Sequence, residues 1–92
     1  MRLVWAERAV QDLESIETYI ARDNLSAAIS TTNGLIARAE TLLKHPRKGR
    51  VVPEVANPDI RELIVGNYRL VYRIHGKTIE ILQVFEAHRM FR

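Results

Sequence analysis

Arginines are the residues in this chain whose type and placement could do chemistry. Arg61, Arg69 and Arg73 lie within residues 60–75, and His88 and Arg89 follow after the next predicted strand. A guanidinium binds carboxylates and phosphates through paired N–H donors, and a histidine with a pKa near ~6.5 takes up or releases a proton. The pattern indicates a surface for an anion or an acidic partner. The simpler interpretation is that Arg69 and Arg73 line a solvated strand face.

Residues 60–75, which contain Arg61, Arg69 and Arg73, have the pattern of a β-hairpin. Two β-rich stretches flank Gly66-Asn67, and glycine at the first turn position fits a type II′ turn. In the second stretch the side chains alternate between two faces. One face is apolar, with Tyr68, Leu70, Tyr72 and Ile74, and the other is basic, with Arg69, Val71, Arg73 and His75.

The rest of the chain supplies a short strand, two helices and a third long strand. We predict a strand at 3–5, helices at 6–22 and 25–44 with Asn24 as the second N-cap, a basic connector at 47–53, a strand at 78–85 and a tail at 86–92. The order β-αα-βββ predicts an α+β fold. It is a small antiparallel β-sheet with a helical hairpin packed on one face and the other face open, forming a single domain over residues 1–92.

Composition narrows the classes of function. The net charge of +3 divides into −2 for residues 1–43 and +5 for residues 44–92. The chain has no cysteine and no spacing typical of a metal site, so we expect no metal and no cofactor. No apolar run approaches the ~20 residues of a membrane span, and the first residues lack a signal-peptide core, so we expect a cytoplasmic protein without a membrane partner. The connector cations Arg47, Lys48 and Arg50 form either a solvated loop or an anion-binding hook.

An ordered set of residues across nearly the whole chain resembles the RelE/ParE superfamily of bacterial type II toxins. The matching positions are Trp5, Ala9, Asp12-Leu13, Ile16, Tyr19-Ile20, Asn24, Ala27-Ala28, Leu42, His45-Pro46, Gly49-Arg50, Arg61-Glu62-Leu63, Tyr68 to Arg73, Ile79 to Leu82 and Ala87-His88-Arg89. Superfamily members are small intracellular toxins, each neutralised by a cognate antitoxin that wraps around the fold. The resemblance therefore implies an antitoxin partner and a hetero-oligomer. RelE-like members cut mRNA in the ribosomal A site, whereas ParE-like members act on DNA gyrase.

The residues at the nuclease positions favour the ParE-like branch. RelE-type nucleases, which the chain resembles, use an arginine in the second strand of this hairpin and lysines in the first. Here the arginine is kept as Arg69, but the lysine positions are occupied by Ile60 and Glu62. A carboxylate at Glu62 would repel a scissile phosphate rather than stabilise it. Those enzymes also use a tyrosine near the C-terminus, and no tyrosine follows Tyr72 here. We therefore predict a ParE-like toxin that inhibits DNA gyrase and blocks replication.

Two alternatives stay open. Some superfamily nucleases use histidine and carboxylates, and His88 with Glu62 or Glu86 could imitate that set. The chain would then be a ribosome-dependent mRNA endoribonuclease whose catalytic candidates are Arg69, His88 and Arg89. In the second alternative it is an inactive homologue that acts only as an antitoxin-binding module.

The partner surface follows from the charge and from the resemblance. The predicted partner-binding residues are Arg61, Arg69, Arg73, His88 and Arg89. We expect an antitoxin segment to cover apolar groove surface along the helices and an unpaired sheet edge, with acidic residues facing these arginines. We place the toxic determinant on residues 86–92 and the adjoining sheet.

Overall fold

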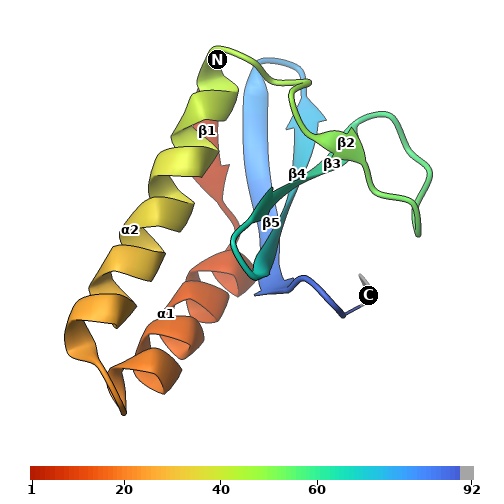
Figure 1. The fold of residues 1–92 in the computed structure, drawn as a ribbon. Coiled ribbons are helices and arrows are strands. Elements are labelled where there is room, and N and C mark those ends of the chain that lie inside the picture. The colour runs from red at the N-terminus through yellow and green to blue at the C-terminus, as the bar shows by residue number, and fades with distance from the viewer. Residues whose placement is uncertain (90–92) are drawn as a thin grey trace.

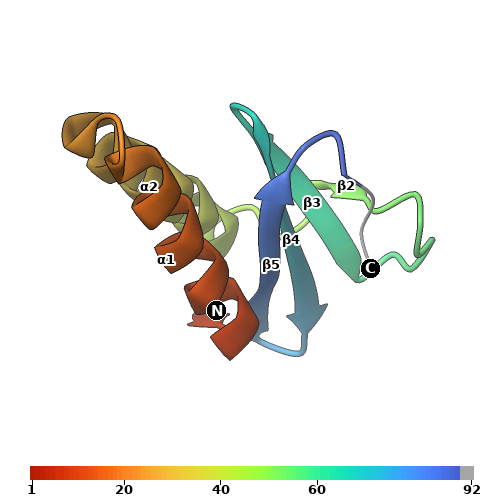
Figure 2. The same cartoon turned by 90° about the horizontal axis from the view of Figure 1, so that it is seen from below.

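The computed structural model describes residues 1–89 and has the predicted order of helices and long strands. Strand β1 (Arg2–Trp5) leads into helices α1 (Glu7–Ala21) and α2 (Leu25–Glu40), and α2 continues into the 3-10 turn η1 (Thr41–Leu43). Strands β2 (Arg50–Val51), β3 (Ile60–Val65), β4 (Tyr68–His75) and β5 (Thr78–Glu86) follow. The two helices lie side by side on one face of a twisted sheet, and the 52–59 loop lies away from them (Figure 1, Figure 2).

The sheet has five strands in the order β1-β5-β4-β3-β2, and it is mixed rather than wholly antiparallel. β1 runs parallel to β5, with Trp5 opposite Ile81, whereas all other neighbours are antiparallel. Parallel neighbours need a crossover, and the helical hairpin begins that crossover here. The fifth strand, β2, lies inside the predicted connector. Its two residues are too few to give an alternating pattern.

The two helices form within the predicted ranges 6–22 and 25–44, and Asn24 lies at the start of the second. The Asn24 side chain accepts a hydrogen bond from the backbone N–H of Ala27 at 3.0 Å, which confirms it as the N-cap of α2. α2 runs without a break through residues 31–34, where weaker helix formers cluster. Thr32 is buried there, and its hydroxyl lies 3.1 Å from the carbonyl oxygen of Ala28 and 3.2 Å from the carboxylate of Glu17 on α1. Packing against α1 therefore outweighs the low propensity of this stretch.

The core lies between the helices and the apolar face of the sheet. Its fully buried side chains come from α2, η1 and the two central strands, namely Leu35, Leu42, Leu70, Tyr72, Ile79 and Ile81. β5 lies between β1 and β4, and it is long and apolar as a central strand should be. The β3–β4 hairpin turns at Gly66-Asn67 with Gly66 at φ 59°, a conformation that glycine adopts readily. Asn67 has no positive φ, so the turn is the predicted type II′.

The face of the sheet opposite the helices is not the open basic face that we predicted. The alternation along β4 is correct, but Arg69 and Val71 are both buried. Arg69 is covered because it bonds Glu54 in the 52–59 loop and the backbone carbonyl of Arg89 after β5. The loop and the residues after β5 thus cover part of this face, and strand periodicity gives no information on such long-range cover.

Candidate functional site

A four-residue charge cluster organises the face opposite the helices. The fully buried carboxylate of Glu62 on β3 accepts the Nε–H of Arg69 through Oε1 and the Nε–H of Arg50 through Oε2, each at 2.6 Å. Both guanidinium Nη atoms of Arg69 donate to the carboxylate of Glu54, each at 2.9 Å. Arg69 is only 6% exposed and Glu62 is 0% exposed, so this pair is buried, whereas the side chain of Arg50 is 61% exposed.

The guanidinium of Arg69 is held firmly in its charged form. The hydrogen bonds that Arg69 donates to Glu54, and then to Glu62, raise its pKa, although burial of the group acts in the opposite direction. Its guanidinium carbon also lies 5.0 Å from the centre of the Phe85 ring on β5, a cation–π distance. One arginine therefore ties together β3, the 52–59 loop and β5.

Arg69 also fixes the start of the tail. Its Nη1 donates to the backbone carbonyl of Arg89 at 2.6 Å, and the N–H of Ala87 donates to the carbonyl of Asn67 at 2.7 Å. The backbone of Arg89 therefore lies beside the guanidinium of Arg69. The side chain of His88 is 74% exposed and lies 3.3 Å from Glu86, and that of Arg89 lies 3.9 Å from the same carboxylate. Residues 90–92, which include Phe91 of the predicted toxic determinant, lie outside the described residues.

The other two predicted arginines are separate from this cluster. Arg61 donates to the carbonyl oxygens of Pro58, Arg47 and Gly49, at 2.8, 3.3 and 2.9 Å, so it holds the chain between η1 and β3. Arg73 is 48% exposed and lies 3.3 Å from Glu80 on β5. Because Arg73 is four strand residues from Arg69, their Cα atoms lie on the order of 13 Å apart along β4. The roles of Arg61, Arg69, Arg73, His88 and Arg89 in partner binding stay predictions.

A buried tyrosine fixes the turn that precedes β2. The hydroxyl of Tyr72 donates to the carbonyl of Pro46 at 2.7 Å and accepts the N–H of Gly49 at 3.0 Å. Burial raises the pKa of Tyr72, against the smaller opposing effects of the Gly49 hydrogen bond and of nearby Arg61 and Arg47. A Cβ on Gly49 would lie 2.5 Å from the carbonyl oxygen of Glu62, so only glycine fits there. No local pattern in the sequence predicts these roles of Glu54, Gly49 and Tyr72, although a glycine beside a basic turn, Gly49, is a signal for a close approach.

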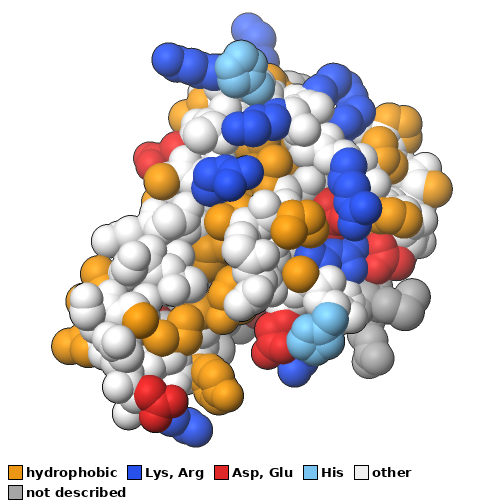
Figure 3. All heavy atoms as spheres, viewed as in Figure 1, with side chains coloured by type: hydrophobic (Ala, Val, Ile, Leu, Met, Phe, Trp, Pro, Cys, Tyr) orange, Lys and Arg blue, Asp and Glu red, His pale blue; other side chains and the backbone are white. Residues whose placement is uncertain are grey.

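The helical side of the molecule presents apolar side chains and an incomplete sheet edge. Val10 and Tyr19 on α1 and Leu25, Ile29 and Ile36 on α2 are exposed, and Figure 3 shows hydrophobic side chains over the helical hairpin and between α2 and the sheet. β1 pairs with β5 only as far as Ile81. Beyond that point the carboxylate of Asp12 accepts the N–H of Val84 at 2.9 Å. A groove of about 240 Å³ lies between α1 and this part of β5, with Asp12, Ile16, Tyr19, Tyr68 and Phe85 in its lining.

Residues 1–89 contain neither a metal-binding cluster nor a helix suited to cross a membrane. Within this range there is no group of three His, Cys, Asp or Glu side chains placed to hold a metal ion. None of its helices combines the length and apolar character that crossing a membrane requires. The candidate surfaces are therefore the Arg69 cluster with the adjoining tail, the helical face, and the basic turn before β2.

Comparison with known proteins assigns the family. The profile of the ParE toxin of type II toxin–antitoxin systems, parDE, matches residues 3–91, nearly the whole chain. The chain belongs to the ParE toxin family. The predicted resemblance to the RelE/ParE superfamily is thereby confirmed, and this ParE-family chain is a toxin of a type II toxin–antitoxin system.

Two relatives match nearly the whole chain at 30% identity. The ParE-family chain is 30% identical to Toxin RelE2 of Caulobacter vibrioides over 90 residues, which covers 97% of this chain and 98% of that one. It is also 30% identical to Y4kP of Sinorhizobium fredii over 92 residues, covering 98% and 92% of the two chains.

Two solved structures share the fold. A chain of the chromosomal ParDE toxin–antitoxin system of P. aeruginosa matches with a TM-score of 0.77 and 24% identity, covering 94% of this chain and 95% of that one. A chain of the RelBE2 toxin–antitoxin complex of Mycobacterium tuberculosis matches with a TM-score of 0.58 and 27% identity, covering 92% and 95%. These likenesses confirm the α+β fold with two helices on one face of the sheet.

Proposed function

We propose that this toxin acts by inhibiting DNA gyrase in the cytoplasm and not by cutting mRNA. The observation that carries the proposal is the environment of Arg69. In the nuclease branch, as the resemblance implies, the corresponding arginine meets the scissile phosphate. Here its guanidinium is almost completely buried and bonded to Glu54 and Glu62. A phosphate could reach it only by displacing two carboxylates, and both would repel the incoming negative charge.

The acid–base groups support the same proposal. Cleavage of RNA by its own 2′-hydroxyl needs a proton acceptor, a proton donor and cations arranged around one phosphate. The hydroxyl of Tyr72 is buried and bonded to Pro46 and Gly49, so it is not available to a substrate. These groups therefore fit the binding of a protein target better than they fit acid–base catalysis.

The test separates the two targets directly. Toxin released from its antitoxin and refolded is added to purified gyrase in a DNA supercoiling assay and, separately, to a translating ribosome system whose mRNA is mapped for A-site cuts. We expect loss of supercoiling and intact mRNA. Intact supercoiling together with A-site cuts would overturn the proposal. Intact supercoiling together with intact mRNA would favour an inactive homologue that only binds its antitoxin.

The tail side chains and one relative favour an mRNA nuclease as the second candidate function. His88 and Glu86 form a close pair on an accessible surface beside Arg89, and Toxin RelE2 is among the relatives at 30% identity. If mRNA cleavage is found, His88→Ala should abolish it, because no other histidine among residues 1–89 lies on the tail. Cleavage that survives this substitution would remove His88 from the mechanism.

We also propose a cognate antitoxin that binds the helical face. The exposed apolar side chains of α1 and α2, and the edge of β5 beyond Ile81, are surfaces on which a helix and a strand dock. The two solved structures that match the fold come from toxin–antitoxin systems, which supports a partner of this kind. Copurification of the toxin with the product of the neighbouring gene tests it. A toxin that is monodisperse and harmless when expressed alone would contradict it.

A further inference from the structure

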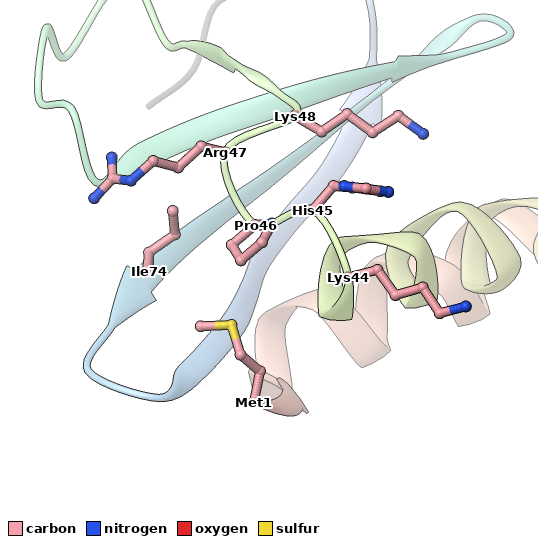
Figure 4. A pocket seen from close by; sticks show the side chains of 7 residues that line it. All are labelled: Met1, Lys44, His45, Pro46, Arg47, Lys48 and Ile74. Carbon is pink, nitrogen blue, oxygen red and sulfur yellow. The ribbon is translucent and has the colours of Figure 1, made fainter.

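The turn after α2 carries a basic hollow that the proposed function does not use. We define the basic hollow by its lining residues Met1, Lys44, His45, Pro46, Arg47, Lys48 and Ile74. Its volume is about 720 Å³, and three apolar side chains line it together with three Lys or Arg side chains and one His. Figure 4 shows Lys44, His45 and Lys48 projecting to one side of the turn and Arg47 to the other, with Pro46, Ile74 and Met1 between them.

The backbone beneath the basic hollow is held in place from two sides. Tyr72 bonds the carbonyl of Pro46 and the N–H of Gly49 from the core. Arg61 bonds the carbonyls of Arg47 and Gly49 from β3. The N–H of Lys48 also donates to the carbonyl of His45 at 3.1 Å. A surface whose backbone is fixed in advance loses little conformational entropy when a ligand binds.

The charge of the basic hollow is only partly neutralised within the chain. Arg47 pairs with Asp59 at 3.2 Å, but neither Lys44 nor Lys48 forms an ion pair with a carboxylate of residues 1–89. The segment 44–50 contains four Lys or Arg residues, one histidine and no carboxylate. An acidic ligand would supply the missing counter-charges and would be attracted to this end of the molecule.

The apolar lining distinguishes between classes of acidic ligand. A nucleic acid offers phosphates to lysines, but its backbone has no apolar side chain to fill a hollow between Pro46, Ile74 and Met1. A peptide with carboxylates on either side of one large apolar residue matches both the cations and the apolar floor. The basic hollow therefore fits a protein segment better than a nucleic acid.

The position of the basic hollow indicates which protein supplies that segment. Leu25, Ile29 and Ile36 are exposed at spacings of four and seven, which places them along one side of α2, and the exposed Leu43 follows in η1. This stripe ends at Leu43, directly before Lys44. Figure 3 shows Lys, Arg and His side chains gathered at that end of the molecule. A chain docked along α2 would therefore continue into the basic hollow.

We infer that the basic hollow binds an acidic segment of the cognate antitoxin that carries one large apolar side chain. The inference rests on the proposed antitoxin partner, and it holds whether the cellular target is gyrase or the ribosome. The antitoxin would then be anchored twice on one toxin, by its docked segment along α2 and by the acidic segment that follows. Joining two weak contacts through one chain strengthens both by effective concentration.

A carbodiimide cross-link that joins an amine directly to a carboxylate tests the contact in the intact complex. The chain has three lysines, Lys44, Lys48 and Lys77, so Lys77 is an internal control outside the basic hollow. We expect Lys44 or Lys48, but not Lys77, to join an Asp or Glu of the coexpressed antitoxin. Cross-links from Lys77 alone, or none from a complex that does form, would overturn the inference while leaving the antitoxin proposal intact. Failure to form any complex would overturn both.

Affinity measurements on paired variants give a second test. We expect Lys44→Glu with Lys48→Glu to weaken antitoxin binding about tenfold at low salt and to reduce its salt dependence. Lys44→Arg with Lys48→Arg keeps the charge at the same positions and should bind as the wild type does. Equal affinity of all three proteins would overturn the inference. A short DNA duplex that binds the wild type and not the Glu variant, with antitoxin affinity unchanged, would assign the basic hollow to nucleic acid instead.

Discussion

Arg69 and Glu62 are diagonal neighbours across the β3–β4 ladder, and the Nε–H of Arg69 donates to Oε1 of Glu62 at 2.6 Å. In the register of the ladder Glu62 stands opposite Val71, and Arg69 stands opposite Ile64. The two charged side chains therefore lean toward each other on the face away from the helices. Each side chain has a further charged partner: Arg50 donates to Glu62, and Arg69 donates to Glu54.

The first prediction concerns the cost of breaking this pair. Glu62→Ala leaves the buried Nε–H of Arg69 without its acceptor while Glu54 still pairs with the Nη atoms, so we expect the unfolding free energy to fall by about 1.5–3 kcal/mol. Urea unfolding followed by circular dichroism measures the loss. Replacing both residues with apolar ones of similar size, Glu62→Leu with Arg69→Met, should recover part of it. A Glu62→Ala protein as stable as the wild type would contradict the role of Glu62 as a buried counter-ion.

The second prediction compares the effect on stability of replacing two glycines, Gly49 and Gly34, with alanine. Gly49→Ala brings a Cβ to 2.5 Å from the carbonyl oxygen of Glu62 and 2.7 Å from the Tyr72 hydroxyl, so we expect a loss of about 1–3 kcal/mol from overpacking. Gly34 lies within α2 with no atom within 4 Å of its added Cβ, so Gly34→Ala should stabilise by about 0.5–1 kcal/mol. Thermal unfolding of the two variants should give shifts of opposite sign. Shifts of the same sign would show that the close approach at Gly49 is misjudged.

The third prediction concerns alkaline pH. Burial raises the pKa of Tyr72 and of Tyr68 above their ordinary value of 10.0. The folded protein then keeps protons that the unfolded chain has released. The contribution of these groups to stability is complete below about pH 10 and is lost as the pH rises through their folded-state pKa values. Unfolding free energy measured across this range should fall with pH.

Tyr72→Phe is the control for the alkaline prediction. The variant should show a smaller fall of stability with pH than the wild type, because one of the two shifted groups is gone. It should also be less stable at neutral pH by about 1–3 kcal/mol, since Pro46 and Gly49 lose their partner. An unchanged pH slope would mean that Tyr72 titrates alike in the folded and unfolded states.

The fourth prediction separates the backbone of the tail from its side chains. A variant that ends at Phe85 lacks the Arg89 carbonyl, so Arg69 loses a charge-assisted hydrogen bond, at a cost of about 1.5–3 kcal/mol. Arg89→Ala keeps that carbonyl and removes an exposed side chain, so its stability should stay within about 0.5 kcal/mol of the wild type. Growth inhibition should decrease in both variants. Full toxicity of the shortened chain would refute the placement of the toxic determinant on residues 86–92.

The elements that the sequence predicted well are those with local signals. The stripe Ala9, Leu13, Ile16 lies on the core side of α1, and Asn24 caps α2 through a contact three residues away. The Gly66 turn and the alternation along β4 depend on neighbouring residues only. Such features follow from propensity and period, which the sequence displays directly.

The features that escaped prediction depend on residues far apart in the chain. Arg69 looks like a surface cation until Glu54, fifteen residues away, and the Arg89 carbonyl cover it. The parallel pairing of β1 depends on a strand that begins at Thr78. β2 is recognisable only from its pairing with β3. No local pattern predicts these contacts, because each depends on how the whole chain closes.

The pairing of β1 with β5 constrains when this protein can finish folding. Among residues 1–89, Thr78 to Ile81 are the only strand partners of Arg2 to Trp5, so β1 cannot pair until β5 has been synthesised. Contacts of such long range form slowly and late. The hairpin of α1 and α2 can form early, whereas the sheet edge beside it closes only after residues 78–86 have been synthesised. An antitoxin that recognises the early helical face could therefore meet the nascent toxin before it is complete.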